Sequence, residues 1–318
     1  MQIDLSIPEL FNYQGRNPRP HDFDSYWDNA LKELDATPPN VELKISKFKC
    51  PSVECFDLWY TGVRGARIYA KYARPKEIKG PIPAVFFFHG YSGSSPDWFE
   101  LLPFCAAGMV VAAMDCRGQG GLSEDTGGVK GTTHRGHIVR GLDDIPDNLL
   151  FRHVFLDTAQ LVRAVTGFSE VDVNRLGCCG ASQGGGLSIA CAALDPRIKR
   201  CAPVYPFLSD YKRVWEMDLA KDAYQELKDY FRRFDPRHER QEDVFTKLGY
   251  IDIQFLAPRI EAQVLMQTGL MDTVTPPSSQ FAAYNKIKSP KKVLFYPDFA
   301  HEEFPELWDI VLEFLGEL

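Results

Sequence analysis

The chain has 318 residues, of which 45% are hydrophobic and 13% are aromatic, a composition typical of a globular protein with a sizeable core and not of a disordered one. Its formal net charge of −7 argues against a nucleic-acid-binding protein, because such proteins carry a basic surface that neutralises phosphates. The basic residues at 232–240 are interleaved with acids and fit a solvated helical face. We therefore expect no nucleic-acid partner.

The N-terminal sequence MQIDLSIPEL lacks the basic and continuous apolar regions of a signal peptide. No apolar run reaches the roughly 18 residues that a membrane-spanning helix needs, so we expect a cytoplasmic protein without a membrane partner. Most of the eight cysteines lie in apolar runs and should be free thiols in a reducing compartment. The adjacent Cys178 and Cys179 should face opposite sides of a strand. A disulfide between Cys50 and Cys55 across a hairpin remains an alternative.

The first predicted element is an amphipathic helix at about 21–36. Its apolar residues Phe23, Trp27, Leu31 and Leu34 recur at helical spacing. Three β-rich stretches follow, at 43–49, 54–61 and 66–72. The last two flank a glycine-bounded turn and predict a hairpin, so we expect this opening block to be antiparallel.

The pattern then changes to short β-rich runs separated by helix-length segments, which is typical of a parallel sheet with helical crossovers. The runs lie at 84–88, 110–114, 175–179, 200–204, 264–267 and 293–296. Two segments are too long for simple crossovers: a loop at 117–148, and 207–259, where charged helices such as WEMDLAKDAYQEL at 215–227 should form a cap above the strand ends. We predict one α/β domain over 1–318, with a mostly parallel twisted sheet, antiparallel N-terminal strands, flanking helices and a helical insertion.

A glycine-rich segment, GASQGGG at 180–186, follows the third of these runs. Ser182 is the centre of G-x-S-x-G, with Gly180 and Gly184, in the strand–turn–helix context of a nucleophile elbow. The tight turn strains the serine backbone, so neighbours without side chains avoid clashes. A P-loop would need lysine followed by serine or threonine, and Leu187 stands there instead. On this motif alone, a glycine-rich packing turn without chemistry remains an alternative.

An acid and a histidine follow in the order that this template requires. Asp272 lies in the loop after the predicted strand at 264–267, and His301 lies in the loop after the last one, at 293–296. Ser182 would attack the ester, His301 would accept its proton, and Asp272 would orient the imidazole. Asp272 as a turn former and His301 as a helix-end residue remain alternatives. Asp298, three residues before the histidine, is the second choice of acid.

Backbone N–H groups should stabilise the oxyanion that forms during the reaction. The residue after the nucleophile, Gln183, supplies one, and Tyr91 in the HGYSG loop supplies the other. His89 in the same loop is expected to order that loop and not to take part in the chemistry. His134 and His137 have H-x-x-H spacing but no nearby acidic ligand pattern, so we expect neither a metal nor a cofactor.

With these residues placed, the whole chain resembles carbohydrate esterase family 7, which contains acetyl xylan esterases and cephalosporin C deacetylases. Three motifs carry the resemblance, in order: R-G-Q (Arg117, Gly118, Gln119), G-x-S-Q-G-G (Gly180 to Gly185) and H-E (His301, Glu302). The stretches HGY, FLSDY and PPSSQFAAYN are also similar to this family. The resemblance implies an α/β-hydrolase fold, deacetylation of small acetylated sugars and of acetylated cephalosporins, and a homohexamer whose active sites open toward an internal cavity.

The resemblance also implies the roles of Ser182, Asp272 and His301 as a triad and of the Tyr91 and Gln183 backbones as oxyanion donors. We expect Arg117 and Gln119 to brace the nucleophile loop by hydrogen bonds, and Gly185 and Gly186 to let the following helix pack closely. Two other functions stay open. An α/β-hydrolase with another ester specificity, such as a longer-chain esterase or a dienelactone-type hydrolase, is disfavoured by R-G-Q. A non-catalytic binding module is disfavoured because all three triad positions are filled.

Overall fold

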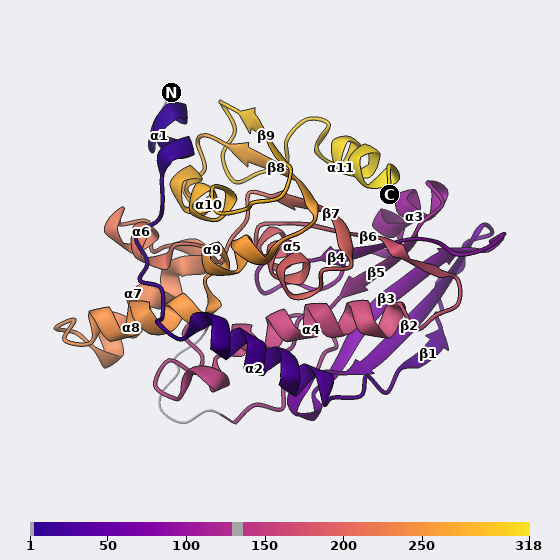
Figure 1. Ribbon diagram of the computed structural model, residues 1–318, viewed down its shortest axis with the longest axis horizontal. Helices are drawn as coiled ribbons and strands as arrows, with labels where there is room; N and C mark the ends of the chain where they lie inside the picture. The colour runs from indigo at the N-terminus through magenta and orange to yellow at the C-terminus, as the bar shows by residue number, and fades with distance from the viewer. Residues whose placement is uncertain (1–2, 129–135) are drawn as a thin grey trace.

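The computed structural model describes residues 3–128 and 136–318, and within them nine strands form one sheet in the order β1-β2-β3-β5-β4-β6-β7-β8-β9 (Figure 1). The strands are β1 (Glu42–Ile45), β2 (Val53–Thr61), β3 (Arg67–Pro75), β4 (Ile82–Phe88), β5 (Val110–Met114), β6 (Val171–Ala181), β7 (Ile198–Val204), β8 (Gln263–Gly269) and β9 (Lys291–Tyr296). Each predicted β-rich run overlaps one of them. The strand expectations are therefore confirmed.

The N-terminal strands differ from the others in direction. β1, β2 and β3 pair antiparallel, and β3 also pairs antiparallel with β5, whereas all remaining pairs are parallel. The β2–β3 hairpin turns through the short 3₁₀ turn η1 (Val63–Gly65). This mixed sheet agrees with the predicted α/β class, because parallel strands need helical crossovers and the hairpin does not.

The helices are α1 (Ile7–Asn12), α2 (Phe23–Asp35), α3 (Trp98–Ala106), α4 (Leu150–Val165), α5 (Gln183–Leu194), α6 (Tyr211–Glu216), α7 (Gln225–Phe234), α8 (Gln241–Leu248), α9 (Ile253–Leu256), α10 (Pro277–Tyr284) and α11 (Leu307–Gly316). Further 3₁₀ turns lie at Pro146–Asn148, Asp222–Tyr224, Gly249–Ile251 and Ala257–Arg259. The helix α2 begins and ends close to the bounds predicted for it. In Figure 1, α2 and α4 lie in front of the sheet, and α3 and α11 lie at the upper right, near the C-terminus.

Two hydrophobic cores cover the two faces of the sheet. Residues of β5 alternate between them: Val110, Ala112 and Met114 pack with α2, α4 and α5, whereas Val111 and Ala113 pack with α3 and α11. This alternation follows from the two-residue period of a strand. Cys178 and Cys179 divide between the same two cores, as expected. All eight cysteines are free thiols, including Cys50 and Cys55.

The segment between β7 and β8 holds α6 to α9, in the region predicted to be a helical cap, but one expectation there is wrong. The stretch 215–227 is not a continuous helix, since α6 ends at Glu216 and α7 begins at Gln225. Asp218 and Asp222 have left-handed φ values of 55° and 51°, which interrupt a helix. The intervening Ala220 is buried in the core, so tertiary packing overrides the local helical pattern.

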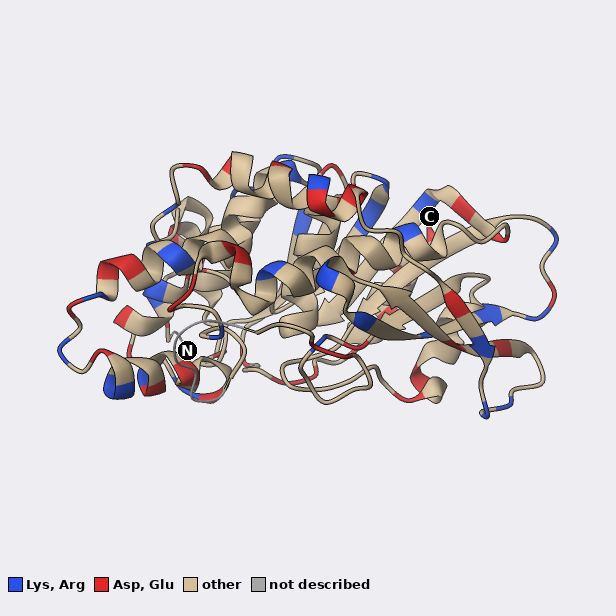
Figure 2. Ribbon diagram, turned by 90° about the horizontal axis from the view of Figure 1, so that it is seen from below, with Lys and Arg blue, Asp and Glu red and all other residues tan. Residues whose placement is uncertain are grey.

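Charged residues of both signs are interspersed over the helices and loops seen in Figure 2. Many of them form ion pairs, such as Arg240, at the end of the basic stretch 232–240, with Asp143. Within the described residues, no helix is both long enough and apolar enough to cross a bilayer.

Candidate active site

Ser182 occupies the sharp turn between β6 and α5. Its φ and ψ values are 58° and −117°, a conformation that residues with side chains rarely adopt and that stores strain. Two hydrogen bonds hold it there: its N–H donates to the Val204 carbonyl (3.0 Å), and its carbonyl accepts from the N–H of Phe207 (2.9 Å). The end of β7 and the residues just beyond it therefore fix the position of Ser182.

The glycines around Ser182 are required by close backbone contacts. A Cβ on Gly180 or Gly184 would lie 2.4 or 2.0 Å from the Phe88 carbonyl oxygen at the end of β4. On Gly185 or Gly186, it would lie 2.7 or 2.3 Å from carbonyl oxygens at or just beyond the end of β7. No such contact is sterically tolerable. The glycines thus let the elbow and the start of α5 pack between two strand ends, as the sequence predicts.

The structure brings together the serine, acid and histidine that the sequence predicts. His301 Nε2 lies 3.0 Å from Ser182 Oγ, and His301 Nδ1 lies 2.8 Å from Asp272 Oδ2. Asp272 is fully buried, and it also accepts hydrogen bonds of 2.8 Å from the N–H groups of Val274 and Thr275. A buried carboxylate with this many donors is held in one orientation, so the imidazole is oriented toward the serine.

Two residues at this site were missed by the sequence analysis. The Thr275 hydroxyl donates to Asp272 Oδ2 (2.8 Å); its position three residues after the aspartate is a turn signal that could have identified it. Tyr205 is the first residue after β7, and its ring packs against that of His301, with ring centroids 4.6 Å apart. By contrast, the second choice of acid, Asp298, is exposed. The carboxylate that hydrogen-bonds to His301 is that of Asp272.

The two predicted oxyanion donors lie at the same edge of the sheet as Ser182. Gln183 is the first residue of α5, where backbone N–H groups have no acceptor within the helix. Phe88, the last residue of β4, is paired in register with Gly180 of β6. The loop that carries Tyr91 therefore leaves the sheet at the same edge as the turn at Ser182. Both predicted donors thus belong to chain segments that leave the sheet where β6 leads into Ser182.

His89 orders the loop that carries Tyr91. Its Nε2 accepts a hydrogen bond from the N–H of Cys116 (3.0 Å), and its Nδ1 lies 2.7 Å from the Gly90 carbonyl. Nδ1 must therefore carry the proton, and burial lowers the pKa of the imidazole. This neutral ring bridges two loops and has the structural position that the sequence analysis expected.

Gln119 of the R-G-Q motif connects the same loop to the nucleophile turn. Its side-chain amide and that of Gln183 hydrogen-bond to each other in both directions, at 2.9 and 3.0 Å. The Gln119 Oε1 atom also accepts the N–H of Ser92 (3.0 Å). Gln119 therefore holds both predicted oxyanion segments, which agrees with the bracing role expected for it.

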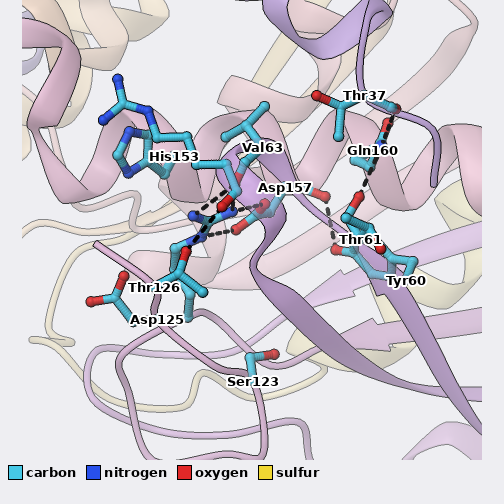
Figure 3. Close-up of polar contacts among 12 residues, drawn as sticks. Thr37, Tyr60, Thr61, Val63, Ser123, Asp125, Thr126, His153, Asp157 and Gln160 are labelled. Carbon is cyan, nitrogen blue, oxygen red and sulfur yellow. Dashed lines mark hydrogen bonds and ion pairs between the residues drawn. The ribbon is translucent and has the colours of Figure 1, made fainter. Parts of the chain in front are cut away.

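Arg117 was expected to brace the nucleophile loop by hydrogen bonds, but its hydrogen bonds go to other segments. Its guanidinium lies 2.6 Å from each carboxylate oxygen of Asp157 in α4 and donates to the Val63 carbonyl in η1 (3.3 Å). Figure 3 shows Asp157 and Val63 side by side, with Tyr60 close to Asp157. The Tyr60 hydroxyl donates to the Asp157 carbonyl (2.9 Å). The buried arginine thus ties the R-G-Q loop to the β2–β3 hairpin and to α4, a long-range contact that local sequence does not encode.

The possible H-x-x-H metal site rests on one described residue, because His134 lies outside the described residues. His137 Nε2 lies 3.0 Å from Ser92 Oγ. Burial, together with the nearby Arg140 charge, lowers the pKa of His137 to about 4. Within 3–128 and 136–318, no group of three or more histidine, cysteine, aspartate or glutamate side chains is arranged to hold a metal ion.

A family model described as acetyl xylan esterase (AXE1) matches residues 1–318. The chain is 29% identical over 305 residues to acetyl esterase Axe7A of Xylanibacter ruminicola, a match that covers 92% of this chain and 66% of that protein. The chain therefore spans about two-thirds of the length of this curated relative.

Two solved structures are similar over nearly their full length. Acetyl xylan esterase 1 from Thermoanaerobacterium sp. JW/SL YS485 is 57% identical, with a TM-score of 0.97 and coverage of 99% of both chains. An acetyl xylan esterase from Paenibacillus sp. R4 is 35% identical, with a TM-score of 0.94, and the match covers 98% of this chain and 99% of that one.

Proposed function

This chain belongs to the acetyl xylan esterase family, and we propose that it removes acetyl groups from acetylated xylo-oligosaccharides and other small acetylated sugars through an acetyl-Ser182 intermediate. The observation that carries the proposal is the hydrogen-bonded series from Ser182 through His301 to the buried Asp272. This geometry supports nucleophilic catalysis, because an alcohol becomes a competent nucleophile only when an adjacent base takes its proton.

In the first half of the reaction, His301 Nε2 accepts the Ser182 proton while Oγ forms a bond to the acetyl carbonyl carbon. The carbonyl oxygen becomes negative and accepts hydrogen bonds from the Gln183 and Tyr91 N–H groups. The imidazolium, stabilised by Asp272, then donates its proton to the sugar oxygen as the C–O bond breaks. In the second half, His301 takes a proton from water, the hydroxide attacks the acetyl-serine, and acetate leaves as Ser182 regains its proton.

A cavity of about 420 Å³ next to Tyr91, lined by side chains that carry hydrogen-bonding groups, supports a sugar as the alcohol portion of the ester. It is lined by Tyr91, Ser92, Gly136, His137, Asp222, Gln225, Glu226 and Asp229. Carboxylate and amide groups match sugar hydroxyls, which both donate and accept hydrogen bonds.

The proposal extends to three properties that the family resemblance supports: deacetylation of cephalosporin C, assembly as a homohexamer, and a cytoplasmic location. None of them requires a cofactor, a nucleic acid or a membrane. Light scattering tests the assembly, and a monomer at micromolar concentration would contradict it.

The function is tested by acetate release from a panel of acetylated xylo-oligosaccharides, other acetylated sugars and cephalosporin C. We expect acetylated sugars to be turned over, and Ser182→Ala to lower kcat by about 10⁴ to 10⁶. A chain-length series of 4-nitrophenyl esters serves as the specificity control. Faster hydrolysis of butyrate or octanoate than of acetate would indicate the longer-chain esterase alternative.

A further inference from the structure

Glu226, near the start of α7, places a buried carboxylate between the inserted helices and the oxyanion loop. The residue is only 4% exposed. One oxygen accepts a hydrogen bond from the Tyr91 hydroxyl, and the other accepts the N–H of Val139 (2.9 Å). The backbone approaches so closely that a Cβ on Gly136 would lie 2.3 Å from the carboxylate. The chain is therefore folded tightly around this acid.

Tyr91 links this carboxylate to the nucleophile. Its ring packs edge-on against Phe207, with centroids 5.6 Å apart, and the Phe207 N–H donates to the Ser182 carbonyl. The next residue, Ser92, is held through its N–H by Gln119. Tyr91 is thus restrained at its ring by Glu226 and Phe207 and at its backbone by the R-G-Q motif. A shift of the ring would move the N–H proposed as an oxyanion donor.

Burying the Glu226 carboxyl costs free energy, because the charged form loses its hydration. Burial raises the pKa of this carboxyl to about 7, although its hydrogen bonds oppose the shift. The contacting groups from Tyr91 and Val139 are donors. A carboxylate accepts them through both oxygens, whereas a neutral amide of the same shape can accept through only one. Hydrogen bonds to a charged acceptor are also stronger and better at fixing a partner.

We propose that Glu226 is a positioning residue that fixes the Tyr91 ring and, through it, the Tyr91 backbone N–H that stabilises the oxyanion. The inference rests on the proposed function, because it needs Tyr91 to be an oxyanion donor at Ser182. It makes a specific prediction: removing the carboxylate or removing the phenol should impair the same step, since each breaks the same connection.

A double-mutant cycle on 4-nitrophenyl acetate hydrolysis tests the proposal with Glu226→Gln, Tyr91→Phe and the double variant. Loss of an oxyanion donor costs about 10²- to 10³-fold in kcat, and a misplaced donor should cost part of that, about tenfold. We expect each single variant to lose about tenfold in kcat with KM changed less than about twofold. The double variant should be no slower than the slower single one, because both changes disable one connection.

Glu242→Gln is the matched control. It removes the same charge from the exposed face of α8, where Glu242 pairs with Lys212 (3.1 Å), and its kcat should equal that of the parent. A Glu226→Gln kcat within twofold of the parent, or losses that multiply in the double variant, would overturn the proposal.

If Glu226→Gln does not fold, Tyr91→Phe decides alone, and an unchanged kcat overturns the proposal. Ser182→Ala is measured in parallel to separate the two ideas. If Ser182→Ala is inactive while Glu226→Gln behaves like the parent, only the positioning role fails. If Ser182→Ala stays active, the proposed function and the positioning role fail together.

Discussion

The side chains of Gln119 and Gln183 form a reciprocal amide pair, in which each Nε2 donates to the other residue's Oε1 at 2.9 and 3.0 Å. Gln183 is fully buried and directly follows Ser182. Gln119 also holds the N–H of Ser92. One glutamine of the R-G-Q motif therefore connects the two chain segments that supply the proposed oxyanion donors.

Replacing Gln119 by alanine should impair catalysis more than binding. The substitution leaves the buried Gln183 amide without this partner, at a cost of about 1–3 kcal/mol in the free energy of unfolding, and it releases the Ser92 N–H. We expect kcat for 4-nitrophenyl acetate to fall about tenfold with little change in KM. Gln119→Glu keeps the Ser92 acceptor and should retain more activity than the alanine variant. Equal kcat for parent and Gln119→Ala would show that the pair has no catalytic consequence.

The buried ion pair between Arg117 and Asp157 predicts a large effect on stability. Asp157→Asn leaves a guanidinium that is 1% exposed without its counterion, and breaking a buried pair in this way costs about 3–5 kcal/mol. The midpoint of urea unfolding should fall accordingly. Asp35→Asn is the control, because Asp35 pairs with Arg163 at the same 2.6 Å but is 65% exposed, and it should cost less than about 1 kcal/mol. Similar midpoints for the two variants would contradict this account.

The nucleophile turn should not tolerate even one additional methyl group. In Gly184→Ala, the new Cβ would lie 2.0 Å from the Phe88 carbonyl oxygen, so α5 would have to move away from β4. We expect loss of at least 100-fold in kcat and of about 3 kcal/mol or more in stability. Gly316→Ala in α11 meets nothing within 4 Å and should be neutral or stabilising by about 0.5–1 kcal/mol. An active and stable Gly184→Ala variant would rule out the packing described for the elbow.

Asp252 should make stability depend on pH. Burial, together with the nearby Asp210 charge, raises the pKa of Asp252 to about 7, above its value of about 3.9 in an unfolded chain. The folded state then binds the proton more tightly, so its contribution to stability is full below the unfolded pKa and is lost as pH rises through about 7. Asp252→Asn removes this titration but keeps an oxygen that can accept the Gln254 N–H (3.1 Å).

Urea unfolding of both proteins between about pH 5 and pH 8.5 measures this effect. The stability of Asp252→Asn relative to the parent should rise with pH. A difference that stays constant over the range would show that Asp252 keeps an ordinary pKa in the folded protein.

The sequence was sufficient for elements whose local pattern agrees with their environment. β5 has the bounds predicted, Val110–Met114, because all five residues are apolar and buried on both faces. β6 begins four residues before its predicted start, at Val171, since polar residues such as Asp172 and Asn174 extend the strand toward solvent and carry no apolar signal. Ser182, Asp272 and His301 could be predicted because each lies in a turn or loop that follows a strand.

The missed features depend on contacts between distant segments. Glu226 lies in a highly charged stretch that predicts a solvated surface, yet it is buried against Tyr91, which is 135 residues away. Arg117 was expected to brace the nucleophile loop but pairs with Asp157 of α4. A charged side chain has no periodicity that distinguishes a buried partner from solvent. The burial and the partners of such residues can be recognised only from the folded structure, which brings the distant segments together.

The central claim is that Ser182 is the nucleophile and that His301 activates it. Labelling with a fluorophosphonate, followed by peptide mass spectrometry, measures this directly. The account predicts one adduct on Ser182, a strongly slowed reaction in His301→Ala, and normal labelling in Asp298→Asn. An active enzyme that carries no adduct on Ser182, or that is labelled equally fast without His301, would contradict it.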